Sequence, residues 1–201
     1  MKKFVTMLLA LVMVLSLAAC GGGSDSLTVE KGKLHMSTNA EFPPYEMVTN
    51  DGGFEGIDVE VAGLIAEKMG LELVVDDMGF TAALEAVQNG RSDIAMAGIT
   101  VNEDRLANMD FTDSYATGVQ VVIIKADSPA VQSIDDLASA ALIGTQEGTT
   151  GYIYCSYPPE EGGYGEDHVV AYETGAVAVQ ALLAGQVDCV VIDNQPAQEY
   201  V

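Results

Sequence analysis

Two stretches far apart in the chain share one helix, turn and strand pattern, which constrains the fold more than any other feature. Residues 83–98 and 178–193 align without gaps and share Ala83/Ala178, Ala86/Ala181, Gly90/Gly185 and Asp93/Asp188. Each stretch reads as a helix, a glycine that ends it, an Asp and an apolar strand. Any αβ unit has a similar pattern, so four identities do not establish a duplication. One equivalent unit in each half nevertheless favours two similar lobes over a single sheet.

The rest of the chain also alternates between strand and helix patterns, which indicates an α/β fold with largely parallel strands. Apolar residues recur at helical spacing in residues 57–69 before Gly70, and further helices are expected from Thr81, Ser133, Thr149 and Gly175. Strands are expected at residues 34–37, 71–75, 94–97, 119–124, 142–144, 169–172 and 187–193. Residues 156–168 hold two Pro and three Gly and are expected to form a surface loop.

The N-terminal residues have the pattern of a secretory signal. Lys2 and Lys3 precede an uncharged run, residues 4–19, which is shorter than the roughly 20 apolar residues that a spanning helix needs. Residues 17–20, Leu-Ala-Ala-Cys, resemble the lipobox of bacterial lipoproteins, so Cys20 is expected to carry lipid after removal of residues 1–19. A tether over residues 20–30 would then hold the protein at the outer face of the cytoplasmic membrane.

The negative charge of the chain limits the classes of partner that it can bind. The formal net charge is −22, and removal of residues 1–19 with their two Lys would make it −24. Nucleic acid and anionic lipid surfaces would be repelled, so no nucleic-acid partner is expected. Apolar residues are abundant and periodic, which argues against disorder.

The Cys and His residues give no sign of a metal site or of a cofactor. His35 and His168 lie far apart in the sequence and no CxxC pattern occurs. Cys155 and Cys189 remain once Cys20 is assigned to lipid. In an exported protein they could form one disulfide or stay as buried thiols, and the sequence leaves both open.

Arg105 is the strongest candidate for binding an anion. It lies five residues after the strand end at Thr100, where an Arg can hold a carboxylate through two parallel hydrogen bonds. A surface Arg paired with the acids nearby fits the local sequence equally well. Residues 148–151, Gly-Thr-Thr-Gly, precede a predicted helix whose free N–H groups would suit an anion, although Thr149 can also be a plain N-cap.

Asp193 is the corresponding candidate for binding a cation. It ends an apolar strand, and ligands of open α/β sheets lie at the carboxyl ends of the strands. By the same rule the other strand end, Gly98-Ile99-Thr100, belongs to the site. Asp193 could instead cap the helix that follows it. A site with both charges fits an α-amino acid, which carries a carboxylate and an ammonium group.

Aromatic and polar residues beside these strand ends complete the set of candidates. Phe42 and Phe80 are expected in loops just past strands, where a role in the core is less certain than inside a strand. Asn39, Glu41 and Tyr45 in the first loop are polar candidates of the same kind.

These motifs together resemble the extracellular amino-acid-binding proteins of ABC importers, solute-binding protein family 3. The resemblance is carried, in the order of the family, by residues 38–46 (TNAEFPPYE), 56–60 (GIDVE), 97–105 (AGITVNEDR), 110–113 (DFTD), 148–151 (GTTG) and 187–193 (VDCVVID). It implies the two-lobed type II periplasmic-binding-protein fold, an α/β fold with a ligand cleft between the lobes. Residues 31–117 would form lobe 1 and residues 118–201 lobe 2, with a hinge near residues 116–126.

The resemblance also assigns roles to the candidate residues. Arg105, Thr100 and the amides of Thr149 and Thr150 would bind the α-carboxylate, while Asp193, the Gly98 carbonyl and the Thr100 hydroxyl would bind the α-ammonium. Phe42 and Phe80 would contact the ligand side chain, and Asn39, Glu41 and Gln146 would face its far end, which favours a polar or basic amino acid.

The family normally continues past the position of Val201 and returns to the first lobe, so that return segment is expected to be absent here. The implied function is delivery of a free amino acid to an ABC permease, without catalysis and without a cofactor. Two alternatives stay open. One is a dehydratase-like enzyme on the same fold, with Glu41 as its acid or base, and the other is a ligand-sensing surface protein.

Overall fold

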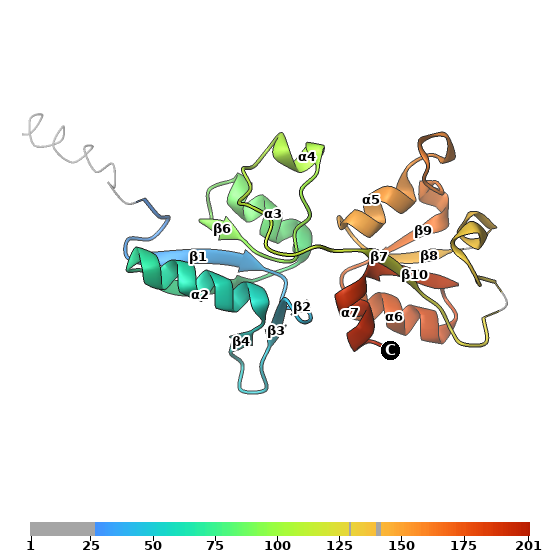
Figure 1. Cartoon of the computed structure of the whole chain (residues 1–201), viewed down its shortest axis with the longest axis horizontal. Helices are drawn as coiled ribbons and strands as arrows, with labels where there is room; N and C mark the ends of the chain where they lie inside the picture. Colours follow the sequence, from blue (N-terminus) through green and yellow to red (C-terminus); the bar gives the residue numbers. More distant parts are fainter. Residues whose placement is uncertain (1–26, 129, 140–141) are drawn as a thin grey trace, which may run out of the picture.

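The computed structural model describes residues 27–128, 130–139 and 142–201. The predicted signal peptide, the predicted lipidation site Cys20 and most of the predicted tether therefore lie outside the described residues. The described elements form two lobes that are joined by an extended segment (Figure 1). No helix among the described residues is long and apolar enough to cross a membrane.

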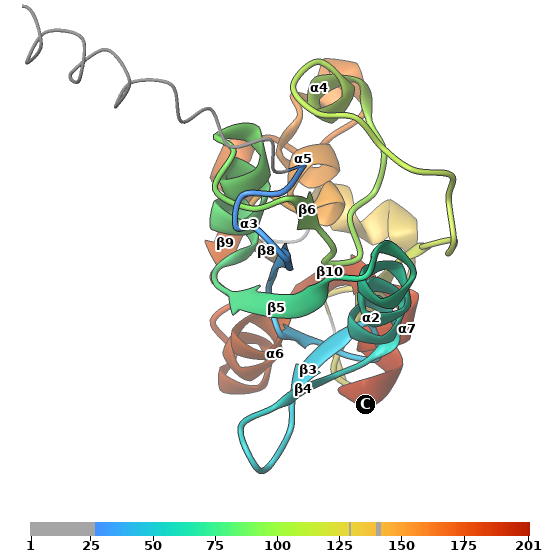
Figure 2. The same ribbon diagram turned by 90° about the vertical axis from the view of Figure 1, so that its left-hand side faces the viewer.

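The first lobe is built on a parallel three-stranded sheet of order β5-β1-β6, formed by β1 (Lys33–Thr38), β5 (Glu72–Asp77) and β6 (Ile94–Ala95). Helices α2 (Ile57–Met69) and α3 (Phe80–Gln88) accompany it, and α4 (Glu103–Leu106) follows. A small antiparallel sheet of β2 (Glu41–Phe42), β3 (Glu46–Val48) and β4 (Phe54–Glu55) contains a hairpin that projects from the lobe in both views (Figures 1 and 2).

The second lobe contains a four-stranded sheet of order β7-β10-β8-β9. Its strands are β7 (Gln120–Ile123), β8 (Ile143–Gln146), β9 (Val169–Tyr172) and β10 (Cys189–Asp193). Its helices are α5 (Thr150–Ser156), α6 (Gly175–Ala184) and α7 (Asn194–Glu199), with 3-10 helices at Ile134–Ser139, Pro159–Glu161 and Glu166–His168. All strand pairs of this sheet are parallel except β7 with β10, so the prediction of a largely parallel α/β fold is confirmed.

Local sequence signals set most of the helix ends. Helix α2 ends where predicted because Gly70 adopts the left-handed conformation (φ 70°), so that the Gly70 N–H donates to the Glu67 carbonyl and the Leu71 N–H to the Ala66 carbonyl. Thr149 accepts a hydrogen bond from the Tyr152 N–H at the start of α5, as a predicted N-cap should. The helix expected from Thr81 begins one residue earlier, at Phe80, with Gly79 at the N-cap position and no side-chain cap.

Each lobe contains one copy of the repeated unit. In the first lobe α3 leads to β6, and in the second α6 leads to β10, with Gly90 and Gly185 both at positive φ between helix and strand. Ala83, Ala86, Ala178 and Ala181 are all buried, since their small side chains let each helix pack closely on its sheet.

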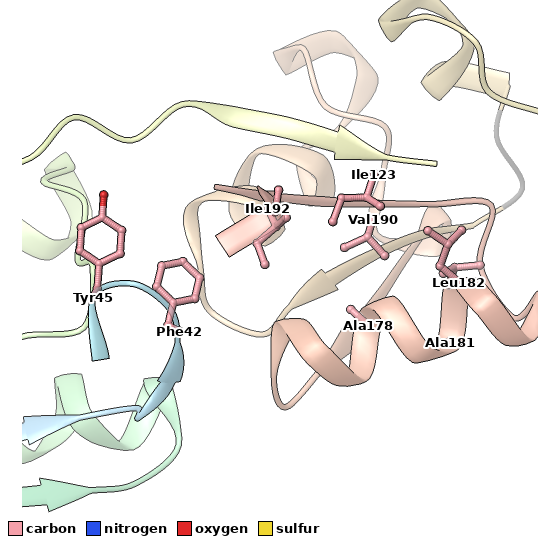
Figure 3. Packing of buried hydrophobic residues seen from close by; sticks show 10 residues of the cluster. Phe42, Tyr45, Ile123, Ala178, Ala181, Leu182, Val190 and Ile192 are labelled. Atoms are coloured by element: carbon pink, nitrogen blue, oxygen red, sulfur yellow. The ribbon is translucent and has the colours of Figure 1, made fainter. Parts of the chain in front are cut away.

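Apolar packing joins the two lobes. Phe42 and Tyr45 of the first lobe belong to one buried cluster with Ile192, Ala178 and other residues of the second lobe (Figure 3). Phe42 is 8% exposed and lies on β2, and Phe80 is the first residue of α3, so the expectation of loop positions for both is wrong. The lobes therefore meet through a dry contact beside the segment that connects them.

Cys155 and Cys189 are free thiols in this structure. Both are buried in a second-lobe cluster with Ile143, Val191 and Leu137, and burial raises the pKa of both thiols, that of Cys155 to about 11. The sequence left a disulfide and buried thiols open for these two residues, and the structure shows buried thiols.

His35 predicts a pH dependence of stability. Its ring lies 2.8 Å from Asp76 and 3.4 Å from Glu30, and the hydrogen bond to Asp76 raises the pKa of His35. A raised folded-state pKa means that the stabilisation is complete below the ordinary His value of about 6.5 and is lost as pH rises through the folded value. At pH 5.5 the free energy of unfolding in urea should be higher for wild type than for His35→Gln, by a few tenths to about 1 kcal/mol. That difference should shrink by pH 8.5, and a difference that grows with pH would contradict the assignment.

Candidate functional site

A narrow cavity lies between the two lobes, at the carboxyl ends of their strands. First-lobe residues on its wall are Asn39, Phe42, Glu46, Phe80, Ala97, Gly98 and Arg105, and second-lobe residues are Gln146, Thr149, Thr150 and Asp193. Its position agrees with the rule that ligands of open α/β sheets bind beyond the strand ends.

The structure brings nine of the thirteen predicted ligand-binding residues to this cavity. Tyr45, Ile99 and Thr100 line an adjoining cavity along residues 111–118, which also touches Gly98 and Asp193. Glu41 lines neither, and its side chain is exposed on β2. Glu46 and Ala97 line the cavity but were not predicted, since no local signal separates Glu46 from the other acids of a chain with 30 Asp and Glu.

Arg105 is buried although it carries a charge. Asn102 caps the short helix α4 by accepting a hydrogen bond from the Arg105 N–H at 2.8 Å, which fixes the backbone from which the side chain leaves. The guanidinium donates to the Thr100 carbonyl at 2.7 Å and to the Gly148 carbonyl of the second lobe at 3.0 Å. It also lies 5.4 Å above the centre of the Phe80 ring, in cation–π geometry.

No carboxylate neutralises this guanidinium at ion-pair distance among the described residues, so the alternative of a surface Arg paired with nearby acids is wrong. Arg105 is only 6% exposed, and burial lowers the pKa of its guanidinium. Two of its five N–H groups are used by the carbonyls, which leaves donors and a positive charge beside the cavity.

Asp193 supplies the opposite charge on the second-lobe wall. It occupies the N-cap position of α7, but its side chain makes no capping hydrogen bond, so the capping alternative is not what this structure shows. Burial raises the pKa of its carboxyl, and a hydrogen bond from Gln120 and the Arg105 charge oppose that rise. The cavity therefore has a cation on one wall and an acid on the other.

Two hydrogen bonds close the lobes across the cavity. The Gln146 side-chain N–H donates to the Asn39 side-chain oxygen at 2.8 Å, and both side chains are buried. The second is the Arg105 bond to Gly148, which has φ +71° and where a Cβ would lie only 2.8 Å from the Thr81 hydroxyl. Because glycine has no Cβ, Gly148 can adopt this left-handed backbone conformation and lets the two lobes approach closely here.

Comparisons with known proteins agree with this architecture. The family model of bacterial extracellular solute-binding proteins, family 3, matches residues 34–196. A probable histidine-binding protein of Neisseria gonorrhoeae is 32% identical over 205 residues, which cover all of this chain and 75% of the relative. The arginine-bound form of truncated ArgBP from T. maritima has a TM-score of 0.75 and 32% identity, over 85% of this chain and 77% of that structure.

A cyclohexadienyl dehydratase of Pseudomonas aeruginosa is also similar, at 30% identity over 146 residues, which cover 69% of this chain and 54% of the enzyme. The chain thus spans between about half and three quarters of the length of these relatives. The likeness to solved solute-binding structures confirms the predicted two-lobed type II periplasmic-binding-protein fold.

Removal of the Arg105 charge should not cost stability. Replacing a buried, unneutralised cation by an apolar side chain of similar length removes its desolvation cost, which offsets the hydrogen bonds that the Thr100 and Gly148 carbonyls lose. Arg105→Met should therefore unfold in urea at the same or a higher midpoint than wild type. Arg91→Met, at the exposed second Arg, is the matched control and should change nothing. A loss of more than about 1 kcal/mol in Arg105→Met alone would show that Arg105 is structural.

Proposed function

This chain belongs to the bacterial extracellular solute-binding proteins of family 3, and on that premise we propose that it binds a free amino acid between its lobes and delivers it to an ABC permease. Relatives named for histidine and arginine binding support the ligand class. Delivery to a permease is inferred from the family and from the predicted lipid anchor at Cys20, which would keep the protein beside the outer face of the cytoplasmic membrane.

The buried guanidinium of Arg105 is the observation that carries this proposal. An isolated charge in a desolvated site is costly unless it is paired. A ligand α-carboxylate would supply the missing negative charge and accept the N–H groups that the two carbonyls leave free. Thr149 and Thr150 lie on the same cavity and would add donors to that carboxylate.

The ammonium end would lie against Asp193 and the Gly98 carbonyl. Burial raises the pKa of the Asp193 carboxyl by depriving it of water, and a ligand ammonium would favour its charged form. The Thr100 hydroxyl would contribute from the adjoining cavity, which shares Gly98 and Asp193 with the main one.

The ligand side chain would lie between the rings of Phe42 and Phe80 and reach the amides of Asn39 and Gln146. Aromatic walls with a polar end favour a long polar or basic side chain. Glu41 has no part in this proposal, because its exposed side chain is absent from the cavity wall.

Binding should require Arg105. Calorimetric titration with L-arginine, L-histidine, L-lysine and L-glutamine should show saturable one-site binding of at least one of them. Arg105→Ala should weaken that binding by at least about thirtyfold, the cost of removing one partner of a buried charged pair. Arg91→Ala should bind as wild type does. Unchanged affinity in Arg105→Ala would refute the site, and the absence of binding by any amino acid would refute the proposed function.

Catalysis is the second candidate, since one relative is a named dehydratase. The acid or base that the sequence suggested, Glu41, does not line the cavity. Prolonged incubation with the bound amino acid should therefore return it chemically intact by mass spectrometry. Its conversion to another compound would replace the binding-protein assignment by an enzyme.

A further inference from the structure

Asp58 is a fully buried acid that lies outside the cavity wall but contacts it. It is the second residue of α2, and its own N–H donates to the Tyr45 carbonyl at 2.9 Å, which fixes the start of the helix against the β2–β3 turn. The position near a helix N-terminus favours a negative charge.

Two groups from different parts of the chain donate to this carboxylate. The Gly98 N–H reaches Asp58 Oδ2 at 3.0 Å, and the Tyr115 hydroxyl reaches Asp58 Oδ1 at 2.7 Å. Gly98 is on the cavity wall, whereas Tyr115 lies in the extended segment that connects the lobes. One side chain thus joins the wall of the site to the inter-lobe connection.

Glu46 is a second buried acid, and it lies beside Asp58. It is also fully buried, and its carboxyl oxygens have no standard hydrogen-bond partner in the part of the chain that the structure describes. Burial and the neighbouring Asp58 raise the pKa of Glu46 to about 11. Burial also raises the pKa of Asp58, and the hydrogen bonds from Gly98 and Tyr115 oppose that rise. The two buried carboxyl groups therefore titrate as a coupled pair, and a proton on the pair removes the repulsion between two buried negative charges.

The Gly98 peptide needs such a restraint. Gly98 has φ +57°, and a Cβ at this position would lie 2.9 Å from the Phe42 ring, so the backbone passes close to the aromatic wall. Its carbonyl is one of the groups assigned to the ligand ammonium. The Gly98 N–H belongs to the peptide unit before the one that carries this carbonyl, so a shift of Gly98 away from Asp58 would carry the carbonyl out of position without unfolding the lobe.

We propose that Asp58 is a positioning residue for the ligand cavity: by accepting hydrogen bonds from the Gly98 N–H and the Tyr115 hydroxyl together, it fixes the ammonium-binding wall relative to the segment that connects the lobes. The effect on a ligand rests on the proposed function, but the restraint on Gly98 does not. Asp58 acts through Gly98 and Tyr115 and does not touch the ligand itself.

The first test needs no ligand. Amide hydrogen exchange measured by NMR should show a protected Gly98 N–H in the wild-type chain. Asp58→Asn should raise the exchange rate of Gly98 at least about tenfold, because an amide oxygen accepts more weakly than a carboxylate. The Ala83 N–H within α3, which donates to the Gly79 carbonyl, is the internal control and should keep its rate. Equal Gly98 rates in the two proteins would overturn the proposal.

The second test uses L-arginine as the probe in calorimetric titrations. Asp58→Asn should weaken its affinity at least about tenfold and Tyr115→Phe about three- to tenfold. The double variant of Asp58→Asn and Tyr115→Phe should be no weaker than Asp58→Asn, because both changes break one connection. Tyr157→Phe, in the second lobe, is the matched control.

The outcomes distinguish a failure of the proposed ligand from a failure of the positioning role of Asp58. If wild type does not bind L-arginine but Gly98 protection falls in Asp58→Asn, the arginine assignment fails and the positioning role stands. If wild type binds and both Asp58→Asn and Tyr115→Phe keep full affinity, or if their effects add in the double variant, the positioning role is refuted. Tyr115 is half-exposed, so Tyr115→Phe should keep the fold, and if Asp58→Asn does not fold, full L-arginine affinity in Tyr115→Phe alone refutes the positioning role.

Discussion

The guanidinium of Arg105 is a positive charge that the protein buries without giving it a neutralising carboxylate at ion-pair distance in the described part of the chain. Desolvating such a group costs several kcal/mol, and the carbonyl groups of Thr100 and Gly148 and the face of Phe80 offset only part of this cost. The rest of the site follows from this constraint. One of the two carbonyls comes from the second lobe, so the same interaction that tolerates the charge also brings the lobes together. In the proposed function, a ligand carboxylate would supply the missing negative charge.

Contacts between the lobes have two physical kinds. Near the cavity they are polar and directional, as in the bond between Gln146 and Asn39, and these set the distance between the walls. Beside them Phe42 packs into the second-lobe cluster, a contact without preferred direction that tolerates sliding and reopening. The bonds of Asp58 are polar and directional too, but they lie within the first lobe and tie Gly98 to Tyr115 of the connecting segment. A binding protein of this design gains affinity from contacts that both lobes make with one ligand.

Local patterns in the sequence predicted the parts of the fold that depend on local physics. The left-handed Gly70 ended α2 and Thr149 capped α5, because both signals act within one turn of a helix. Arg105 was predicted as an anion-binding candidate from its place after a strand end, but its burial and its contact with Gly148 depend on residues 43 positions apart. Glu41 was misplaced because neighbouring residues of a strand point to opposite faces, and burial of Phe42 turns Glu41 outward. Glu46 could not be predicted at all, since its role depends on Asp58 and Gly98, which only the folded lobe brings beside it.

The central claim, that a ligand carboxylate completes the charge of Arg105, is tested most directly by removing that carboxylate from the ligand. Calorimetric titrations of the same protein with L-arginine and with agmatine, its decarboxylated analogue, compare two molecules that share every other group. The account predicts that agmatine binds at least about thirtyfold more weakly, the loss expected when one partner of a buried charged pair is removed. Equal affinity for agmatine and L-arginine would contradict it, because the guanidinium of Arg105 would then have no ligand group to neutralise.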